Sequence, residues 1–160
     1  MPGRPLATAS ADLAFDAVGS SDADVFLAIG SAAWETYHDE PLFGLLRDAL
    51  EANRVVGAIC GATVAAARAG LLEGRTHTSN GRDWLLEQAP GYLGADGYLD
   101  QASAVTDGRL VTASGLAPHT FASSIARLVD PGKAGELTVY EHLYAREFEE
   151  RLRPAEAQAA

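Results

Sequence analysis

The sequence predicts an α/β fold in which helices cover a mostly parallel sheet. Two continuous apolar runs, residues 25–29 and 54–59, are typical of strands that are buried on both faces. A helical pattern follows each run, and strands alternating with helices indicate right-handed crossovers and parallel pairing. The chain has 160 residues and is 48% hydrophobic, which suits one domain with its own core.

The elements of the first half follow in a regular order. Residues 1–11 are rich in Pro, Gly and Ala and are expected to form a disordered lead-in. After the strand 25–29, Pro41 begins a helix whose apolar residues recur three and four positions apart. The strand 54–59 then leads into a helix of small residues that begins at Ala62 and stops at Gly70.

The second half predicts a short polar strand over 76–79, a helix over 82–88 and a hairpin. The hairpin strands cover 102–105 and 110–113 and turn at Asp107-Gly108. Two helices follow, over 118–128 and 135–152. The last one carries an aromatic stripe, most simply its packing face and alternatively a contact between subunits (Tyr140, Leu143, Tyr144 and Phe148). We predict a single domain over 12–153 and a tail over 154–160.

Composition excludes several classes of partner. The net charge of −10 argues against nucleic acid and against an anionic membrane surface. No apolar run approaches the roughly 20 residues of a membrane span, and no signal peptide is recognised. One cysteine and four scattered histidines predict neither a disulfide framework nor a metal site, and no nucleotide-binding glycine motif is present, so no cofactor is expected. We expect a cytoplasmic protein that acts on a small molecule.

The most informative residue is the single cysteine, Cys60. It lies where the strand 54–59 meets a helix, flanked by small residues such as Gly61. This is the layout of a nucleophile elbow, a tight turn that projects its central side chain above the sheet edge. The helix N-terminus there favours a thiolate, and the Gly61 amide could donate to an oxyanion. Alternatively, Cys60 is a small buried apolar residue at a strand end.

A second turn is predicted at the same sheet edge. Gly30 and Ser31 follow the strand 25–29, and ligands bind at the carboxyl ends of strands in open α/β sheets. Their N–H groups could face Cys60, and Trp34 could form a wall of the site. The alternative is an ordinary tight turn with Trp34 as a packing residue.

Several motifs together resemble the ThiJ/PfpI family, which has the class I glutamine amidotransferase-like fold. They are the Ala-Ile-Cys turn at 58–60, the Ala-Gly-Leu-Leu-x-Gly helix end at 69–74 with its Thr-rich continuation to Asn80, and the Asp-Gly-Arg-Leu-Val-Thr-Ala-Ser-Gly stretch at 107–115. The resemblance covers about 12–130 and is greatest to the bacterial branch of type 1 glutamine amidotransferase-like proteins. It implies a flavodoxin-like three-layer sandwich.

The resemblance also implies roles for residues. Cys60 corresponds to the family's reactive cysteine, and Gly61 with the Gly30-Ser31 turn corresponds to its oxyanion-hole amides. The family's histidine on the Thr-rich strand should fall near Ser79 or Asn80, but the nearest histidine is His77. Family domains begin with a strand-helix-strand unit that carries an acidic partner of the cysteine, and this chain starts after it. We therefore expect an exposed strand edge, explained by a truncated reading frame or by a compensating contact such as a homodimer.

These observations predict a cysteine-nucleophile hydrolase, or another amide- or carbonyl-processing enzyme, that acts through Cys60. His77 and His119 are the candidate proton carriers, since each follows an element that ends near the predicted site, and water is the alternative. The competing hypothesis is a non-catalytic thiol module for redox or stress response, or a pseudoenzyme.

Overall fold

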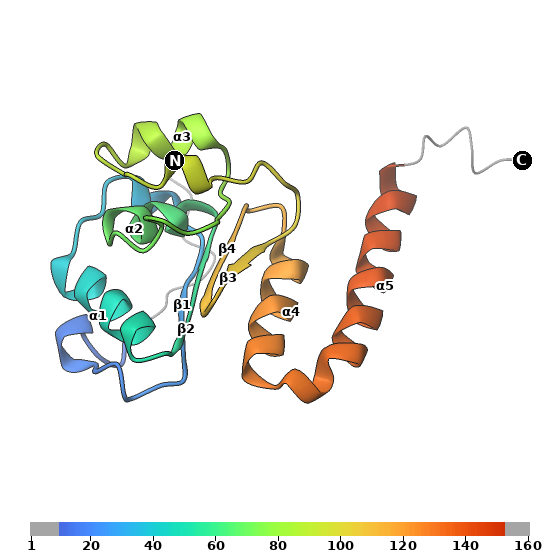
Figure 1. The fold of residues 1–160 in the computed structure, drawn as a ribbon, viewed down its shortest axis with the longest axis horizontal. Helices are drawn as coiled ribbons and strands as arrows, with labels where there is room; N and C mark the ends of the chain where they lie inside the picture. Colours follow the sequence, from blue (N-terminus) through green and yellow to red (C-terminus); the bar gives the residue numbers. More distant parts are fainter. Residues whose placement is uncertain (1–9, 153–160) are drawn as a thin grey trace, which may run out of the picture.

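The computed structural model describes residues 10–152, and their side chains as far as residue 144. The predicted lead-in therefore falls mostly outside the described residues, and the tail entirely so. Figure 1 shows the arrangement. The elements are η1 Phe15–Ala17, β1 Val25–Ala28, η2 Ala32–Glu35, α1 Glu40–Glu51, β2 Val55–Ile59, η3 Cys60–Ala62, α2 Thr63–Arg68, α3 Arg82–Gln88, η4 Ala95–Gly97, β3 Val105–Asp107, β4 Leu110–Ala113, α4 Pro118–Val129, η5 Pro131–Lys133 and α5 Ala134–Leu152.

The sheet has the order β1-β2-β4-β3. β1 pairs with β2 and β2 with β4 in parallel, whereas β3 joins β4 as an antiparallel hairpin partner. This mostly parallel sheet confirms the predicted fold class. Because the three parallel strands share one direction, the loops that follow β1, β2 and β4 all emerge at the same edge.

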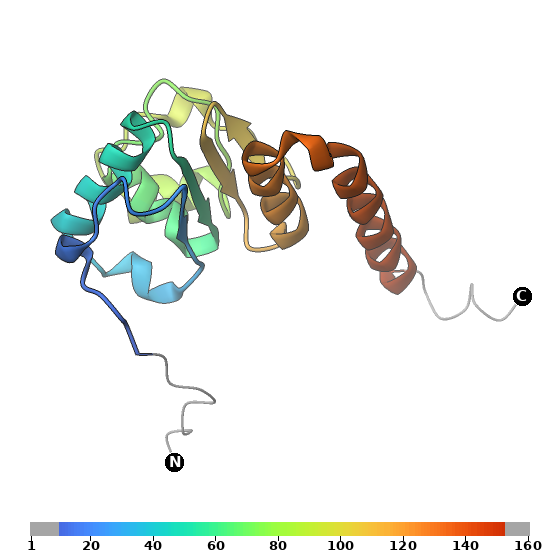
Figure 2. The same ribbon diagram turned by 90° about the horizontal axis from the view of Figure 1, so that it is seen from below.

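Helices cover both faces of the sheet, so the molecule has three layers (Figures 1 and 2). On one face, α1 and α2 pack on the apolar side chains of β1 and β2, including Phe26 and Val56. On the other face, α4 covers β2 and β4 with Phe121 and Ile125. The leucines of α1 fall on one side because they recur with the helical period, and that side is the buried one.

Two parts of the second half differ from the sequence prediction. The segment 76–79 makes only one isolated bridge, between His77 and Tyr98, and is not a strand of the sheet. Its threonines and serine bond to neighbouring side chains in place of a backbone ladder. The hairpin turn is at Asp107-Gly108 as predicted, but β3 begins three residues later than expected.

The aromatic stripe of α5 is not a buried packing face. Tyr140 and Leu143 are 59% and 60% exposed, and Tyr144 is also exposed. Phe148 lies outside the described side chains. In the part of the chain that the structure describes, no helix combines the length and the apolar character needed to cross a membrane.

Candidate functional site around Cys60

Cys60 lies at a strained turn between β2 and the helical segment η3–α2. Its φ angle is +59°, a left-handed conformation that side chains other than glycine rarely adopt. Holding such a residue there costs on the order of 1–3 kcal/mol, which the surrounding structure must supply. The thiol is partly exposed. The strand-to-helix turn expected from the sequence is therefore present, with the side chain at its apex.

Two glycines approach the thiol from the neighbouring loops. A Cβ atom at Gly30, which follows β1, would lie 2.8 Å from the Cβ of Cys60. A Cβ atom at Gly115, which follows β4, would lie 2.9 Å from the Cys60 sulfur. Both distances are shorter than real side-chain contacts allow, so only glycine fits at these positions without a shift. The loops after all three parallel strands thus converge on one sulfur atom.

Asn80 supplies the one hydrogen bond to the thiol found in the described residues. Its Nδ2 donates to the Cys60 sulfur at 3.5 Å, while its Oδ1 accepts from the Gly115 N–H at 2.9 Å. The second bond fixes which end of the amide faces the sulfur, because a backbone N–H can only donate. Asn80 is not among the site residues that the sequence predicts, although the family's histidine was expected at about this position.

The segment before Asn80 is held by polar side chains on both sides. The Thr78 N–H donates to the Thr112 hydroxyl of β4 at 2.9 Å. The hydroxyls of Thr63 and Ser79 are 2.6 Å apart, and the Thr63 hydroxyl also donates to the Cys60 carbonyl at 2.7 Å. Thr63, Thr78, Ser79 and Thr112 are all buried. This network fixes the position of Asn80 relative to the elbow.

The loop after β1 brings the other predicted site residues to the same place. A Cβ at Gly61 would lie 2.2 Å from the Ser31 carbonyl oxygen, so the two backbones are in direct contact. The Ser31 hydroxyl caps η2 by accepting from the Ala33 N–H at 3.1 Å. Within the described residues, the Ser31 N–H has no acceptor. Trp34 donates through Nε1 to the Ile29 carbonyl at 2.8 Å and packs against the core, so it anchors this loop.

Arg68, at the end of α2, fixes the same loop from below. Its guanidinium donates to four carbonyls, those of Trp34, Glu35, Tyr37 and Gln88, at 2.7–2.9 Å. Burial lowers the pKa of Arg68 from its usual value. No sequence motif pointed to this residue, because its partners are backbone atoms of segments more than 19 residues away.

The two candidate histidines have other partners. His77 is fully buried, and its ring nitrogens bond to the Arg75 carbonyl and to the Tyr92 hydroxyl. Burial lowers the pKa of His77 and raises that of Tyr92 to about 12. His119 is stacked on Tyr144 of α5, with ring centroids 3.9 Å apart. The structure therefore gives neither histidine a hydrogen bond to Cys60.

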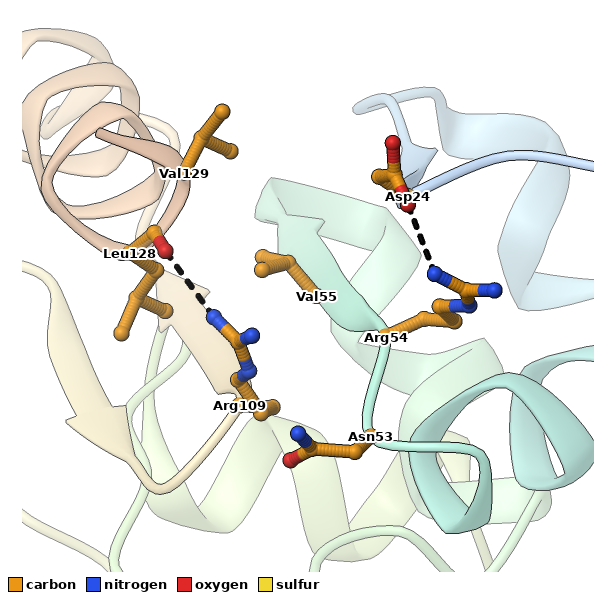
Figure 3. Close-up of a pocket in the computed structure, with 7 residues that line it drawn as sticks. All are labelled: Asp24, Asn53, Arg54, Val55, Arg109, Leu128 and Val129. Atoms are coloured by element: carbon orange, nitrogen blue, oxygen red, sulfur yellow. Dashed lines mark hydrogen bonds and ion pairs between the residues drawn. The ribbon is translucent and has the colours of Figure 1, made fainter.

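No group of three or more metal-ligating side chains occurs among the described residues. A cavity of about 240 Å³ lies at the opposite end of the strands from Cys60, lined by Asp24, Asn53, Arg54, Val55, Arg109, Leu128 and Val129 (Figure 3). It is separate from the elbow.

A mostly parallel sheet with a cysteine at a left-handed strand-to-helix turn is typical of α/β proteins that carry a strand-turn-helix elbow. Comparison with known proteins identifies the group within this class. The model of the DJ-1/PfpI family matches residues 3–128, and the chain belongs to that family. This agrees with the ThiJ/PfpI resemblance carried by the sequence motifs.

Two curated relatives come from Bacillus subtilis strain 168. The chain is 35% identical over 119 residues to the "Uncharacterized protease YoaZ", a match that covers 74% of this chain and 56% of the relative. It is 31% identical over 107 residues to the "Uncharacterized protease YdeA", covering 67% and 53%. The chain thus spans about half the length of the curated relatives it matches.

Solved structures show the same fold. The DJ-1 superfamily protein Atu0886 from Agrobacterium tumefaciens has a TM-score of 0.69 and 33% identity, over 81% of this chain and 70% of that one. A thiJ/pfpI family protein from Bacillus anthracis has a TM-score of 0.62 and 37% identity, over 66% and 50%. Together they support a flavodoxin-like three-layer sandwich with a mostly parallel sheet.

Proposed function

We propose that the protein is a cysteine-dependent hydrolase of small amides or related carbonyl compounds, with Cys60 as the nucleophile. The observation that supports this most directly is the partly exposed thiol at a left-handed turn, with Asn80 donating to its sulfur. A backbone strain of this kind persists where the position of the side chain matters. The relatives named as uncharacterized proteases make a hydrolytic reaction the natural choice.

In the proposed reaction, the Cys60 thiolate adds to the substrate carbonyl carbon and forms a C–S bond, while the π electrons move to oxygen. The N–H groups of Ser31 and Gly61 hold the resulting oxyanion, since the Ser31 N–H is unpaired in the described residues and their backbones adjoin. Collapse of the intermediate breaks the C–N bond and leaves a thioester. Water then attacks the thioester, releases the acid and restores the thiol.

Water carries the protons in this proposal. Both ring nitrogens of His77 are bonded elsewhere and His119 stacks on Tyr144, so neither fits the role of base. Asn80 cannot take a proton at neutral pH, but its N–H stabilises negative charge on sulfur. We place the reaction in the reducing, cytoplasmic setting expected from the composition, with a small molecule as substrate.

The test uses the single cysteine of the chain as its own reporter. Iodoacetamide labelling of the folded protein, followed by mass spectrometry, is expected to give one adduct, and labelling should abolish hydrolysis. A panel of small p-nitroanilides, primary amides and α-dicarbonyls is then compared between the wild type and Cys60→Ser. Loss of at least about 100-fold in rate is expected. A thiol that resists labelling in the folded state would contradict the proposal.

The thiol-switch hypothesis makes a different prediction in the same experiment. The absence of a histidine bonded to Cys60, within the described residues, favours it as the second candidate. In that case Cys60 is alkylated and forms a sulfenic acid with peroxide, but the wild type and Cys60→Ser are equally inactive on the whole panel.

A further inference from the structure

Charged side chains mark the amino edge of the sheet, opposite the edge that carries the cysteine. Asp24, Arg54 and Arg109 each come directly before one of the three adjacent parallel strands β1, β2 and β4. The Val55 N–H donates to the Asp24 carbonyl at 3.0 Å, and the Val56 N–H donates to the Arg109 carbonyl at 2.9 Å. Because neighbouring strands lie about 4.8 Å apart, the three charged side chains start from adjacent points on one edge.

These side chains surround the cavity of Figure 3, called the amino-edge cavity below. Asp24 and Arg54 lie on one side of it, and Leu128 and Val129 of α4 lie on the other. Its volume is about 240 Å³. A water molecule occupies about 30 Å³ in the liquid, so the cavity has room for a small organic ion of roughly eight non-hydrogen atoms.

The two guanidiniums of the cavity are only partly occupied by partners. Arg54 donates through Nη1 to the Asp24 carboxylate at 2.6 Å, and its Nε is buried without an acceptor in the part of the chain that the structure describes. Arg109 donates through Nη1 to the Leu128 carbonyl at 2.9 Å and has no carboxylate partner among the described residues. Since a guanidinium carries five N–H donors, donors of both side chains remain for an acceptor that a ligand supplies.

The cavity is positive, although the chain as a whole is strongly negative. Arg54 and Arg109 line it together with a single carboxylate, that of Asp24, whereas the net charge of the chain is −10. The Asp24 side chain is 85% exposed, and exposed ion pairs of this kind are weak. A monoanion would balance the net charge of the cavity, and a dianion would leave it negative.

The remaining wall of the cavity is apolar. Leu128 and Val129 lie at the end of α4, and Val129 is 55% exposed. An exposed valine next to a guanidinium suits a ligand that has a short hydrocarbon chain and a charged group at one end. A carboxylate is the monoanionic group whose planar shape matches the paired N–H donors of a guanidinium.

We propose that the amino-edge cavity is a binding site for a small aliphatic monocarboxylate. The carboxylate accepts hydrogen bonds from Arg109 and from the side-chain amide of Asn53, and Arg54 adds a second positive charge. The hydrocarbon chain packs against Leu128 and Val129. The site lies at the opposite edge of the sheet from the thiol, so it does not rest on the proposed hydrolysis.

Titration of the nitrogen-labelled protein with sodium hexanoate at pH 7.5, followed by heteronuclear NMR, tests the proposal. Hexanoate is a monoanion of about the size of the cavity. We expect saturable shifts of the backbone N–H signals of Asn53, Arg109 and Val129, with a dissociation constant of about 0.1–5 mM. The signals of Gly61 and Asn80, beside the thiol, should not move. Inorganic phosphate and hexanol are the comparison ligands, and each should bind at least about 10-fold more weakly.

Two variants should change the affinity for hexanoate in opposite directions. Arg109→Gln removes a positive charge from the cavity and should raise the dissociation constant at least about 10-fold. Asp24→Asn removes the competing carboxylate and should lower it about 3-fold. Arg47→Gln is the matched control, because it removes the charge of an arginine that pairs with Glu40 on α1, outside the cavity. If the spectrum of Arg109→Gln shows an unfolded chain, Asp24→Asn decides, since that side chain is exposed.

Three results would overturn the carboxylate site. The first is the absence of saturable shifts up to about 50 mM hexanoate, or shifts confined to Gly61 and Asn80. The second is an affinity that neither Arg109→Gln nor Asp24→Asn changes. The third is phosphate that binds as tightly as hexanoate, which would make the ligand a phosphate instead of a carboxylate.

Discussion

At the scale of single residues, the site is a set of short-range constraints on one sulfur atom. The left-handed backbone at Cys60 fixes where the side chain points, and Gly30 and Gly115 leave room for it. Asn80 then supplies a donor whose orientation is set by the Gly115 N–H. The proposed chemistry therefore depends as much on main-chain positions as on side-chain identities.

Asn80→Asp tests the role of this donor. Aspartate has nearly the same shape but replaces the N–H donor with a negatively charged oxygen, which repels the thiolate that attacks iodoacetamide. We expect the rate of alkylation of Cys60 by iodoacetamide at pH 7.5 to fall about 10-fold. Asn53→Asp is the matched control, since it makes the same side-chain change in the distant cavity. An unchanged rate in Asn80→Asp would remove Asn80 from the site.

Local sequence was sufficient to locate Cys60 and insufficient to locate Asn80. Cys60 directly follows an apolar run typical of a buried strand and precedes a helical pattern, so the strand-to-helix turn can be predicted from neighbouring residues alone. Asn80 is 20 residues from Cys60 and 35 from Gly115, and its role arises only when the loops meet. His77 was predicted as a proton carrier for the same reason. Its position along the chain is close to the expected one, but its bonds to Tyr92 and to the Arg75 carbonyl form only in the folded structure and cannot be read from the sequence.

At the scale of elements, the strands and helices of the parallel core could be predicted to within one or two residues. Their periodicity is set by burial, and β1, β2, α1 and α4 each bury a regular set of side chains. The segment 76–80 could not be predicted, because alternating polar residues fit an exposed strand equally well. Here the side chains themselves provide the bonds that hold the segment against β4.

Arg68→Lys tests whether the loop over residues 31–37 is held as one element. Lysine keeps the charge but cannot reproduce the planar guanidinium that reaches four carbonyls. We expect a loss of about 1–3 kcal/mol in the free energy of unfolding by urea and faster proteolytic cleavage within 31–37. Arg47→Lys is the control, because Arg47 forms only an exposed ion pair with Glu40. Equal stability of Arg68→Lys and wild type would contradict this role.

At the scale of the whole molecule, His77 links folding to pH. It bridges the Thr-rich segment and the Tyr92 region while fully buried, and burial lowers its pKa in the folded state. The unfolded chain therefore binds a proton more readily, near the usual histidine pKa of about 6.5. The contribution of neutral His77 to the free energy of unfolding is therefore fully present above a pH of about 6.5, and it is lost as the pH falls toward the lower pKa of the folded state.

Urea unfolding between pH 7.5 and 5 measures this effect. The free energy of unfolding should decrease with falling pH, by at most about 1.4 kcal/mol per unit for one proton. His77→Gln should be less stable at pH 7.5 but should show a smaller dependence on pH, since the amide does not titrate. The exposed His38, replaced in His38→Gln, is the control and should keep the slope of the wild type. A slope that is unchanged in His77→Gln would contradict the assignment.

The backbone at Cys60 has a consequence for how this chain can change over time. Glycine or asparagine would occupy the same torsion angles at lower energetic cost, and both are reachable by mutation. Selection for stability alone would therefore favour replacement of Cys60 by one of these residues. If the proposed reaction is what retains Cys60, a relative that has lost the reaction should carry glycine or asparagine at this position before the rest of the turn changes.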